Sequence, residues 1–263
     1  MGKKACVFVD GESFRHSIVD LFEQFKSYDY LPKADWDELF DYFVRKAIPR
    51  NEYERVRTYW YVIDLLDFYP YRFPDADSNT EDLQQLLSRN KQIKKKLQKL
   101  QDKDALIAGM KEVVINLTKS KKALQSRFQG WKTVQDNISV SSSRVEFRRA
   151  GAITYNLLWE RFGKEKAVDV KLAVDLIGLR EIYDLAVIIS GDQDYVPAVQ
   201  VVKDFGKTVV NVAFRTKDEK LLPGGAWRLN QHTDDNIEIP YNDLAKYLNI
   251  PGMTTPELPL EKD

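Results

Sequence analysis

The sequence is poor in the residues that most enzymes use for nucleophilic and redox chemistry. It has one cysteine, Cys6, and two histidines, His16 and His232, among 263 residues. A single cysteine excludes an internal disulfide and a zinc site built from several cysteines. Two histidines leave little scope for histidine-based catalysis, so any chemistry has to depend on carboxylates.

Long apolar runs and an excess of charge of one sign are also lacking. No apolar stretch is long enough to span a bilayer and no signal peptide is evident, which predicts a cytoplasmic protein. The 40 basic and 40 acidic residues cancel, so the net charge excludes no class of partner. The length allows one large domain or two small ones, with enough chain to bury a core.

The stretch AVIISGDQDYVPA, residues 186–198, combines an apolar run with two carboxylates. Its β-branched residues, Val187 to Ile189, do not alternate with polar ones, which predicts a strand buried on both faces of a parallel sheet. Asp192 and Asp194 then lie at the carboxyl edge, where open α/β folds bind ligands. Two acids there repel one another unless a cation or a proton joins them. The alternative is that they only cap the next helix.

Two other segments place acids in similar positions. The apolar run 5–9 ends in Asp10-Gly11-Glu12-Ser13 and precedes a helical pattern, and Asp169 lies in the first turn of a helix predicted over residues 164–179. A helix after Tyr195 and a strand over residues 208–214 complete a β-α-β unit, which implies a parallel crossover. The fold class is therefore α/β with a mostly parallel sheet.

The middle of the chain has a different pattern. Residues 55–63 predict a second strand, and residues 64–79 a loop because they contain two prolines and several turn residues. Apolar residues in steps of three and four then predict an inserted antiparallel helical hairpin over residues 80–137, with its tip near residues 101–109. We expect residues 138–148 to return to the sheet, and residues 151–162 form a connector whose structure the sequence does not predict.

The charge is unevenly distributed along the chain. The segment from Arg89 to Lys132, called the basic segment below, has 13 basic residues against 3 acidic ones, a net charge of +10. Such a segment indicates a phosphate-rich partner, although a solvated coiled coil or a homodimer contact would have the same composition. Its aromatic residues, Phe128 and Trp131, fall on the apolar seam, which favours contact with nucleic-acid backbone over base stacking. The candidate nucleic-acid-binding residues are Lys94, Lys95, Lys96, Lys99, Lys119, Lys121, Lys122 and Arg127.

Four fragments in order carry a resemblance to a known family: FVDGES, KAVDVKLAVDL, SGDQDYVPAV and GKTVVNVAF. Together they resemble the NYN domain of the PIN-like nuclease superfamily, in particular its LabA-like (DUF88) branch. The resemblance implies a Rossmann-like three-layer α/β/α sandwich formed by residues 1–79 and 138–250. We expect residues 251–263 to be a disordered tail.

The resemblance also implies the site. Acids of the family hold Mg²⁺ or Mn²⁺ for phosphodiester hydrolysis, usually of RNA, and the matching positions are Asp10, Asp169, Asp192 and Asp194. Asp10 and Asp192 are expected to bind the metal most directly. Glu12, Ser13, Asp175 and Ser190 are expected around them, with Asp175 facing another side of its helix. Ser13 stands where the family usually has asparagine, and serine cannot bridge two groups as an amide does.

The sequence thus predicts a metal-dependent endoribonuclease whose basic helical segment contacts RNA, with a structured RNA such as tRNA as one candidate. Two alternatives from other classes stay open. One is a catalytically inactive module of the same fold that binds RNA or protein, with Ser13 as the sign of lost activity. The other is an assembly protein whose hairpin pairs with a partner coil.

Overall fold

The computed structural model describes residues 2–25, 31, 33–48, 53–72, 75, 77–100, 102–222 and 227–250. The chain divides into two compact units. The first comprises residues 1–62, 133–150 and 168–263, and the second comprises residues 63–132 and 151–167. The predicted tail, residues 251–263, lies outside the described residues. The domain boundaries expected from the sequence, after residues 79 and 137, stay predictions.

Parallel strands form the centre of the first unit. Among the described residues the strands follow the order β4-β3-β2-β1-β5-β6-β7, and β8 pairs with β6. β1 is parallel to β2 and β5, and β6 is parallel to β5 and β8. The strands are β1 (Lys3–Asp10), β2 (Tyr53–Tyr69), β3 (Val145–Asn156), β4 (Arg161–Phe162), β5 (Leu185–Ile189), β6 (Thr208–Arg215), β7 (Leu221–Leu222) and β8 (Asp235–Ile239).

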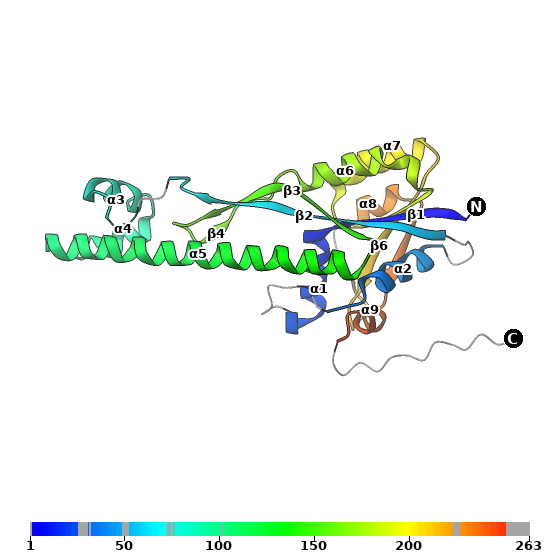
Figure 1. The fold of residues 1–263 in the computed structure, drawn as a ribbon, viewed down its shortest axis with the longest axis horizontal. Helices are drawn as coiled ribbons and strands as arrows, with labels where there is room; N and C mark the ends of the chain where they lie inside the picture. The colour runs from blue at the N-terminus through cyan, green and yellow to red at the C-terminus, as the bar shows by residue number, and fades with distance from the viewer. Residues whose placement is uncertain are drawn as a thin grey trace. The chain divides into compact units, whose positions relative to one another are not determined.

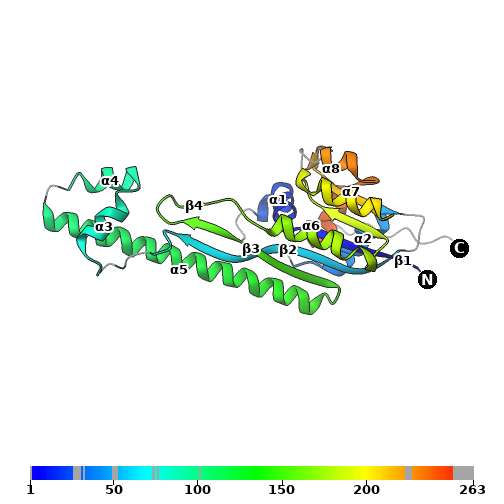
Figure 2. The same cartoon turned by 90° about the horizontal axis from the view of Figure 1, so that it is seen from above.

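Helices cover both faces of this sheet. In Figures 1 and 2, α6 and α7 lie on one face and α1, α2 and α9 on the other. The predicted α/β class with a mostly parallel sheet is therefore confirmed. The bounds are α1 (Gly11–Leu21), η1 (Glu23–Phe25), α2 (Trp36–Ala47), α6 (Val168–Gly178), η2 (Arg180–Ile182), η3 (Gln193–Tyr195), α7 (Val196–Asp204), α8 (Trp227–His232) and α9 (Tyr241–Tyr247).

Aromatic packing holds α1 and α2 on their face of the sheet. The ring of Phe14 on α1 lies 5.5 Å from that of Trp60 on β2 and 5.6 Å from that of Phe214 on β6, measured between centroids. Trp36 on α2 lies 5.0 Å from Trp60. These rings are fully buried, and pairs of this kind contribute beyond their buried area. The packing therefore places the start of α1 firmly against the end of β1.

Burial on both faces makes the single cysteine chemically inert. Cys6 lies on β1, is fully buried, and has a pKa raised by that burial to about 12. Since only the thiolate reacts, at pH 8 about one Cys6 in ten thousand would be reactive even if reagent reached it. We expect iodoacetamide to leave the native protein unmodified and to alkylate it fully in denaturant, measured by mass spectrometry. Alkylation of the native protein at the rate of a free thiol would contradict this placement.

The helices of the second unit differ from the two-helix hairpin expected from the sequence. They are α3 (Thr80–Leu87), α4 (Lys91–Leu97) and the part of α5 (Lys103–Ser141) up to Lys132. The first expected helix is divided because Asn90 caps α4, accepting from the backbone N–H groups of Gln92 and Ile93 at 2.8 and 3.1 Å. Its buried amide also donates to the carbonyl of Leu158. A seam residue predicted to pack in a coiled coil is therefore a helix cap.

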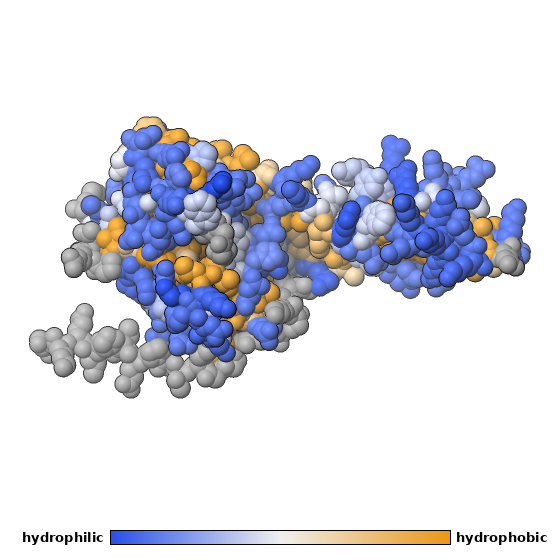
Figure 3. All heavy atoms as spheres, turned by 180° about the vertical axis from the view of Figure 1, so that it is seen from behind, coloured by the Kyte–Doolittle hydropathy of each residue, from blue (hydrophilic) through white to orange (hydrophobic). Residues whose placement is uncertain are grey.

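Apolar residues of the predicted seams form the core of the second unit. Its buried members are Leu83, Leu86, Leu87, Leu97, Met110, Val114, Leu117 and Leu158. Hydrophilic side chains dominate the outer surface of these helices on the face seen in Figure 3. The apolar seams are thus confirmed as packing positions up to Leu117, whereas the seam residues Phe128 and Trp131 are only half-buried.

Two stretches expected to be irregular are strands. β2 continues to Tyr69 through part of the predicted loop 64–79, and β3 includes residues 151–156, which the sequence left unassigned. Asp64 resembled a turn residue in the sequence, but its carboxylate forms an ion pair with Lys132 at 3.0 Å. Pairing removes the cost of an acidic residue in the strand.

None of the described helices is long and apolar enough to cross a membrane.

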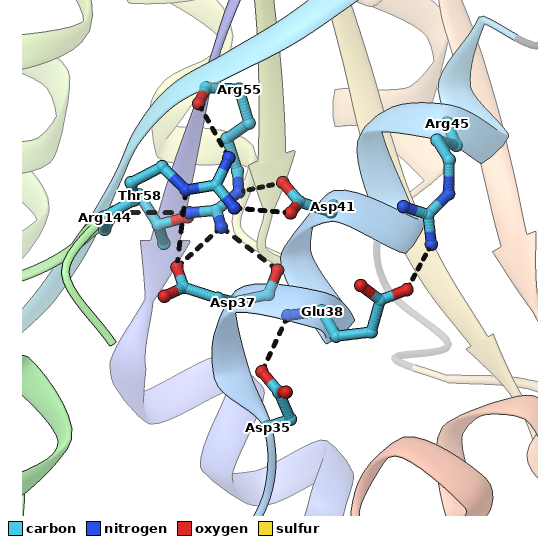
Figure 4. Close-up of polar contacts among 8 residues, drawn as sticks. All are labelled: Asp35, Asp37, Glu38, Asp41, Arg45, Arg55, Thr58 and Arg144. Atoms are coloured by element: carbon cyan, nitrogen blue, oxygen red, sulfur yellow. Dashed lines mark hydrogen bonds and ion pairs between the residues drawn. The ribbon is translucent and has the colours of Figure 1, made fainter. Parts of the chain in front are cut away.

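A buried arginine connects α2, β2 and the start of β3 in the first unit (Figure 4). The side chain of Arg55 is fully buried and donates to Asp41 at 2.7 Å, to Asp37 at 2.7 Å and to Thr58 at 3.1 Å. It also donates to the carbonyl of Arg144, whose own guanidinium binds Asp41 at 2.7 Å. Charge-assisted hydrogen bonds thereby hold α2, β2 and the start of β3 together.

Candidate functional site

The carboxyl ends of two neighbouring parallel strands bring the first site residues together. Val9 of β1 and Ile189 of β5 are register partners, so Asp10 and Ser190, the next residues, lie side by side. The hydroxyl of Ser190 donates to Oδ2 of Asp10 at 2.8 Å, and both residues are buried. The topology rule for parallel sheets therefore predicted this contact correctly.

Asp10 also begins α1. Its Oδ1 accepts from the backbone N–H of Ser13 at 3.1 Å, and its Oδ2 accepts from the Ser13 hydroxyl at 2.8 Å. Gly11 makes this turn possible, because a Cβ there would lie 2.3 Å from the carbonyl oxygen of Tyr61. Ser13, the residue that departs from the family pattern, thus contacts the first predicted acid directly.

The turn after β5 repeats this arrangement. The backbone N–H of Asp192 donates to the Ser190 hydroxyl at 3.0 Å, and Asp192 in turn accepts from the backbone N–H of Asp194 at 2.9 Å. Asp192 therefore caps η3, and Asp10 caps α1. Of the two residues for which capping was the alternative, Asp192 is a cap and Asp194 is not. Capping does not account for the short contact that joins Asp10 to the turn through Ser190.

Tyr195 connects a third element to the cluster, and the sequence analysis did not single it out. Its buried hydroxyl lies 2.8 Å from Oδ1 of Asp169 on α6 and 3.4 Å from Oδ2 of Asp10. A hydroxyl has one proton, so the shorter contact with Asp169 is the hydrogen bond. Burial and these carboxylates raise the pKa of Tyr195 well above its usual value, so the hydroxyl stays protonated. The sequence signal that could have identified Tyr195 is its position directly after the SGDQD motif.

The four predicted acids influence one another electrostatically. Partial desolvation raises the pKa of the Asp169 carboxyl, the hydrogen bond from Tyr195 lowers it, and the charges of Asp10, Asp192 and Asp194 raise it further. Repulsion of this kind shows that the negative charges of Asp10, Asp192 and Asp194 lie close to Asp169. Asp10 is buried, while the other three are partly or fully exposed.

The remaining predicted residues lie at the margin of the cluster or apart from it. Exposed Glu12 lies 3.5 Å from His16 one helical turn away. Asp175 is buried and accepts from Lys171 at 2.7 Å and from Tyr61 at 3.2 Å, and it also contacts Arg148. Those contacts satisfy Asp175 on another side of α6, as its spacing from Asp169 predicted.

An open hollow of about 590 Å³ lies beside the cluster in the first unit. One wall is the exposed side of α1 with Ser13, His16 and Asp20, and the other is the turn with Asp192 and Gln193. The sequence analysis did not identify Asp20, because nothing in its spacing distinguishes it from a solvated helix residue. The hollow is large enough for a nucleotide and has acidic groups on both walls.

The donor set fits one kind of metal site. Among the described residues, no three Asp, Glu, His or Cys side chains are close enough together to hold one ion. Oδ2 of Asp10 already accepts hydrogen bonds from two serine hydroxyls. Mg²⁺ is commonly bound through one or two carboxylates and keeps several waters. The acids around Asp169 fit such a hydrated ion and do not fit a preformed cage of three or more ligands.

The candidate nucleic-acid-binding residues lie on the helices of the second unit. Seven of the eight are exposed, and Lys121 is half-buried with its Nζ 5.4 Å from the centre of the Phe68 ring. Exposed lysines in this number create a positive potential that attracts phosphates. The expected coiled-coil or homodimer contact stays a prediction.

Comparison with known proteins places the chain in a family. The NYN domain family matches residues 82–223, more than half of the chain, a range that includes Asp169, Asp192 and Asp194. Curated proteins gave no match. The chain is similar to a crystal structure of a protein of unknown function from Vibrio parahaemolyticus, with 14% identity and a TM-score of 0.42 over 90% of this chain and 93% of that one. The LabA-like branch stays a prediction. On the extent of the family match, the chain belongs to the NYN domain family.

Proposed function

We propose that the protein is a metal-dependent endoribonuclease. NYN domains have a PIN-like fold, are generally nucleases and generally use divalent metal ions. The observation that carries the proposal is the set of contacts joining Asp10, Ser190, Asp192, Tyr195 and Asp169 at one edge of the sheet. Capping alone would not require acids of three separate elements to meet beside an open hollow.

Some of these residues would bind the metal ion, and others orient the residues that bind it. Asp169, Asp192 and Asp194 present partly or fully exposed carboxylates, and one or two of them would bind the hydrated ion directly. Bound Mg²⁺ or Mn²⁺ would generate hydroxide from water and stabilise the leaving oxygen of the phosphodiester. Buried Asp10 is a positioning residue, because it orients the Ser190 hydroxyl that accepts from the backbone of Asp192. Tyr195 orients the Asp169 carboxylate by donating to it.

RNA is the proposed substrate because of the second unit. The basic segment carries a net charge of +10 on exposed helices, and phosphates are the ligands that such a surface attracts without sequence preference. A small phosphorylated metabolite would have no need of so extended a basic surface. RNA binding should consequently weaken steeply as salt rises, whereas an apolar coiled-coil contact would not.

The test compares one carboxylate in the site with one outside it. Purified protein would be incubated with tRNA and single-stranded RNA in Mn²⁺, Mg²⁺ or EDTA, beside the variants Asp192→Asn and Asp204→Asn. Asp204 is an exposed residue at the end of α7, so it controls for the chemical change. We expect cleavage only with metal, normal cleavage by Asp204→Asn, and the EDTA level for Asp192→Asn.

Unchanged cleavage by Asp192→Asn, or cleavage in EDTA, would contradict the assignment and indicate a contaminating nuclease. Salt-sensitive RNA retention without cleavage under any condition would favour the non-catalytic binding module. Circular dichroism of each variant would verify that loss of the Asp192 cap has not unfolded the chain.

A further inference from the structure

Three aromatic side chains form a row across the strands of the second unit. Phe68 of β2 and Tyr155 of β3 have ring centroids 6.3 Å apart, and Tyr155 and Phe162 of β4 have centroids 4.8 Å apart. Tyr155 and Phe162 are register partners on antiparallel strands, so their side chains lie on the same sheet face. Both pairs meet edge to face, with interplanar angles of 70° and 67°.

The row becomes steadily more exposed toward the edge of the sheet. Phe68 is 8% exposed, Tyr155 is half-buried and Phe162 is 52% exposed. Lys121 of α5 lies over the Phe68 ring, so α5 covers the row at that end. In Figure 2, β4 forms the outer strand beside β3. Because more than half of Phe162 is exposed, part of its ring is open to a further flat group.

Cations lie beside this row. Lys121 lies over its buried end, and Arg161 precedes Phe162 on β4, with its side chain on the opposite face of the strand. The Arg161 guanidinium also lies 5.9 Å from the ring of Trp159, which is 43% exposed. The adjoining Leu158 is buried in the core of the unit, which anchors this turn. Exposed rings interspersed with cations are the combination that binds single-stranded nucleic acid.

We propose that the exposed end of this row, the ring of Phe162, is a stacking site for unpaired bases of single-stranded RNA, and that Trp159 and Arg161 contact the same RNA from the other face of β4. It rests on the proposed function in that RNA is the ligand, and it adds base contacts to a segment for which the sequence favoured backbone contact. The bases stack on the ring faces while lysines of α5 bind the adjoining phosphates. The second unit then distinguishes unpaired RNA from a duplex, whose bases are already stacked on one another.

The test measures binding without cleavage, so that its failure is separate from failure of the nuclease assignment. The full chain carrying Asp192→Asn would be titrated in EDTA with a fluorescein-labelled oligouridylate of about twelve nucleotides. A second probe would be the abasic strand with the same number of phosphates. We expect anisotropy to show binding of the base-containing strand at least about tenfold tighter than that of the abasic strand, a gain within the range that stacking of one base contributes.

Variants separate stacking from charge. Phe162→Ala should reduce the preference for bases to about twofold and leave abasic binding unchanged, and Phe162→Trp should restore the preference. Lys121→Gln should weaken binding of both probes equally. Phe205→Ala is the matched control, since Phe205 lies in the first unit, is 55% exposed and has an arginine over its ring. Phe205→Ala should change the affinity for neither probe.

Equal affinity of the Asp192→Asn protein, without any further substitution, for the two probes would overturn the stacking site. So would an equal loss for both probes in Phe162→Ala, which would show that the ring only supports the fold. Absence of binding to either probe would also overturn the stacking site. The cleavage assay would then test the acidic site of the first unit independently.

Discussion

Replacing Arg55 with alanine should lower the free energy of unfolding by about 3–5 kcal/mol. The Arg55 side chain is fully buried, and it donates to two carboxylates, a hydroxyl and two backbone carbonyls. Removing one partner of a buried ion pair costs far more than the pair contributes, since the opposite charges stay behind in a site of low polarity. Arg144 alone cannot compensate, because its guanidinium lies 3.9 Å from Asp37 and is 40% exposed.

Urea unfolding followed by circular dichroism would measure the effect. Arg45→Ala is the matched control, because Arg45 binds Glu38 at the same 2.7 Å distance but both side chains are at least half exposed. Exposed pairs contribute less than about 1 kcal/mol. A loss for Arg55→Ala no larger than that for Arg45→Ala would show that the network is not formed in solution.

The second large effect is expected at Asp10, where two substitutions separate charge from shape. Asp10→Ala leaves two serine hydroxyls and the N–H of Ser13 without their acceptor, so we expect a loss of about 3 kcal/mol together with loss of cleavage. In Asp10→Asn the amide oxygen can still accept from Ser13, and the hydroxyls can rotate to accept from the amide. The cost should then be about 1 kcal/mol.

Cleavage should nevertheless fall about 10- to 100-fold in Asp10→Asn, because an uncharged amide orients the Ser190 hydroxyl and the turn carrying Asp192 less strongly. Thermal unfolding and initial cleavage rates would be measured on the same preparations. A parallel loss of stability and cleavage in both variants would show that Asp10 acts only as a structural cap.

The sequence was sufficient to predict the acidic site because the signal is local. Buried β-branched runs end directly at Asp10 and near Asp192, and parallel strands must deliver such residues to one edge. Tyr195 and Asp20 were missed for the opposite reason. Their roles depend on which residues of other elements lie next to them, and those neighbours cannot be predicted from residue type or spacing.

The fold outside the sheet centre was harder to predict. Asp64 resembles a turn signal, and its pairing with Lys132 explains why β2 continues past it to Tyr69, directly before the prolines. Asn90 occupied an apolar position in a repeat of threes and fours, and only its contacts with α4 and Leu158 reveal it as a cap. In both cases a partner distant in the sequence overrides the local pattern.

The capping of α1 by Asp10 and of η3 by Asp192 has a consequence for how related sequences are compared. Selection for a stable fold alone would retain both aspartates in a descendant that has lost activity, so their presence is a poor marker of an active protein. Asp169 lies in the first turn of α6, where an acid contributes about 0.3–1 kcal/mol, and it also accepts the hydrogen bond from Tyr195. Its carboxylate is exposed and begins no helix, so among related sequences a loss of activity should appear as a substitution at Asp169 before one at Asp10 or Asp192.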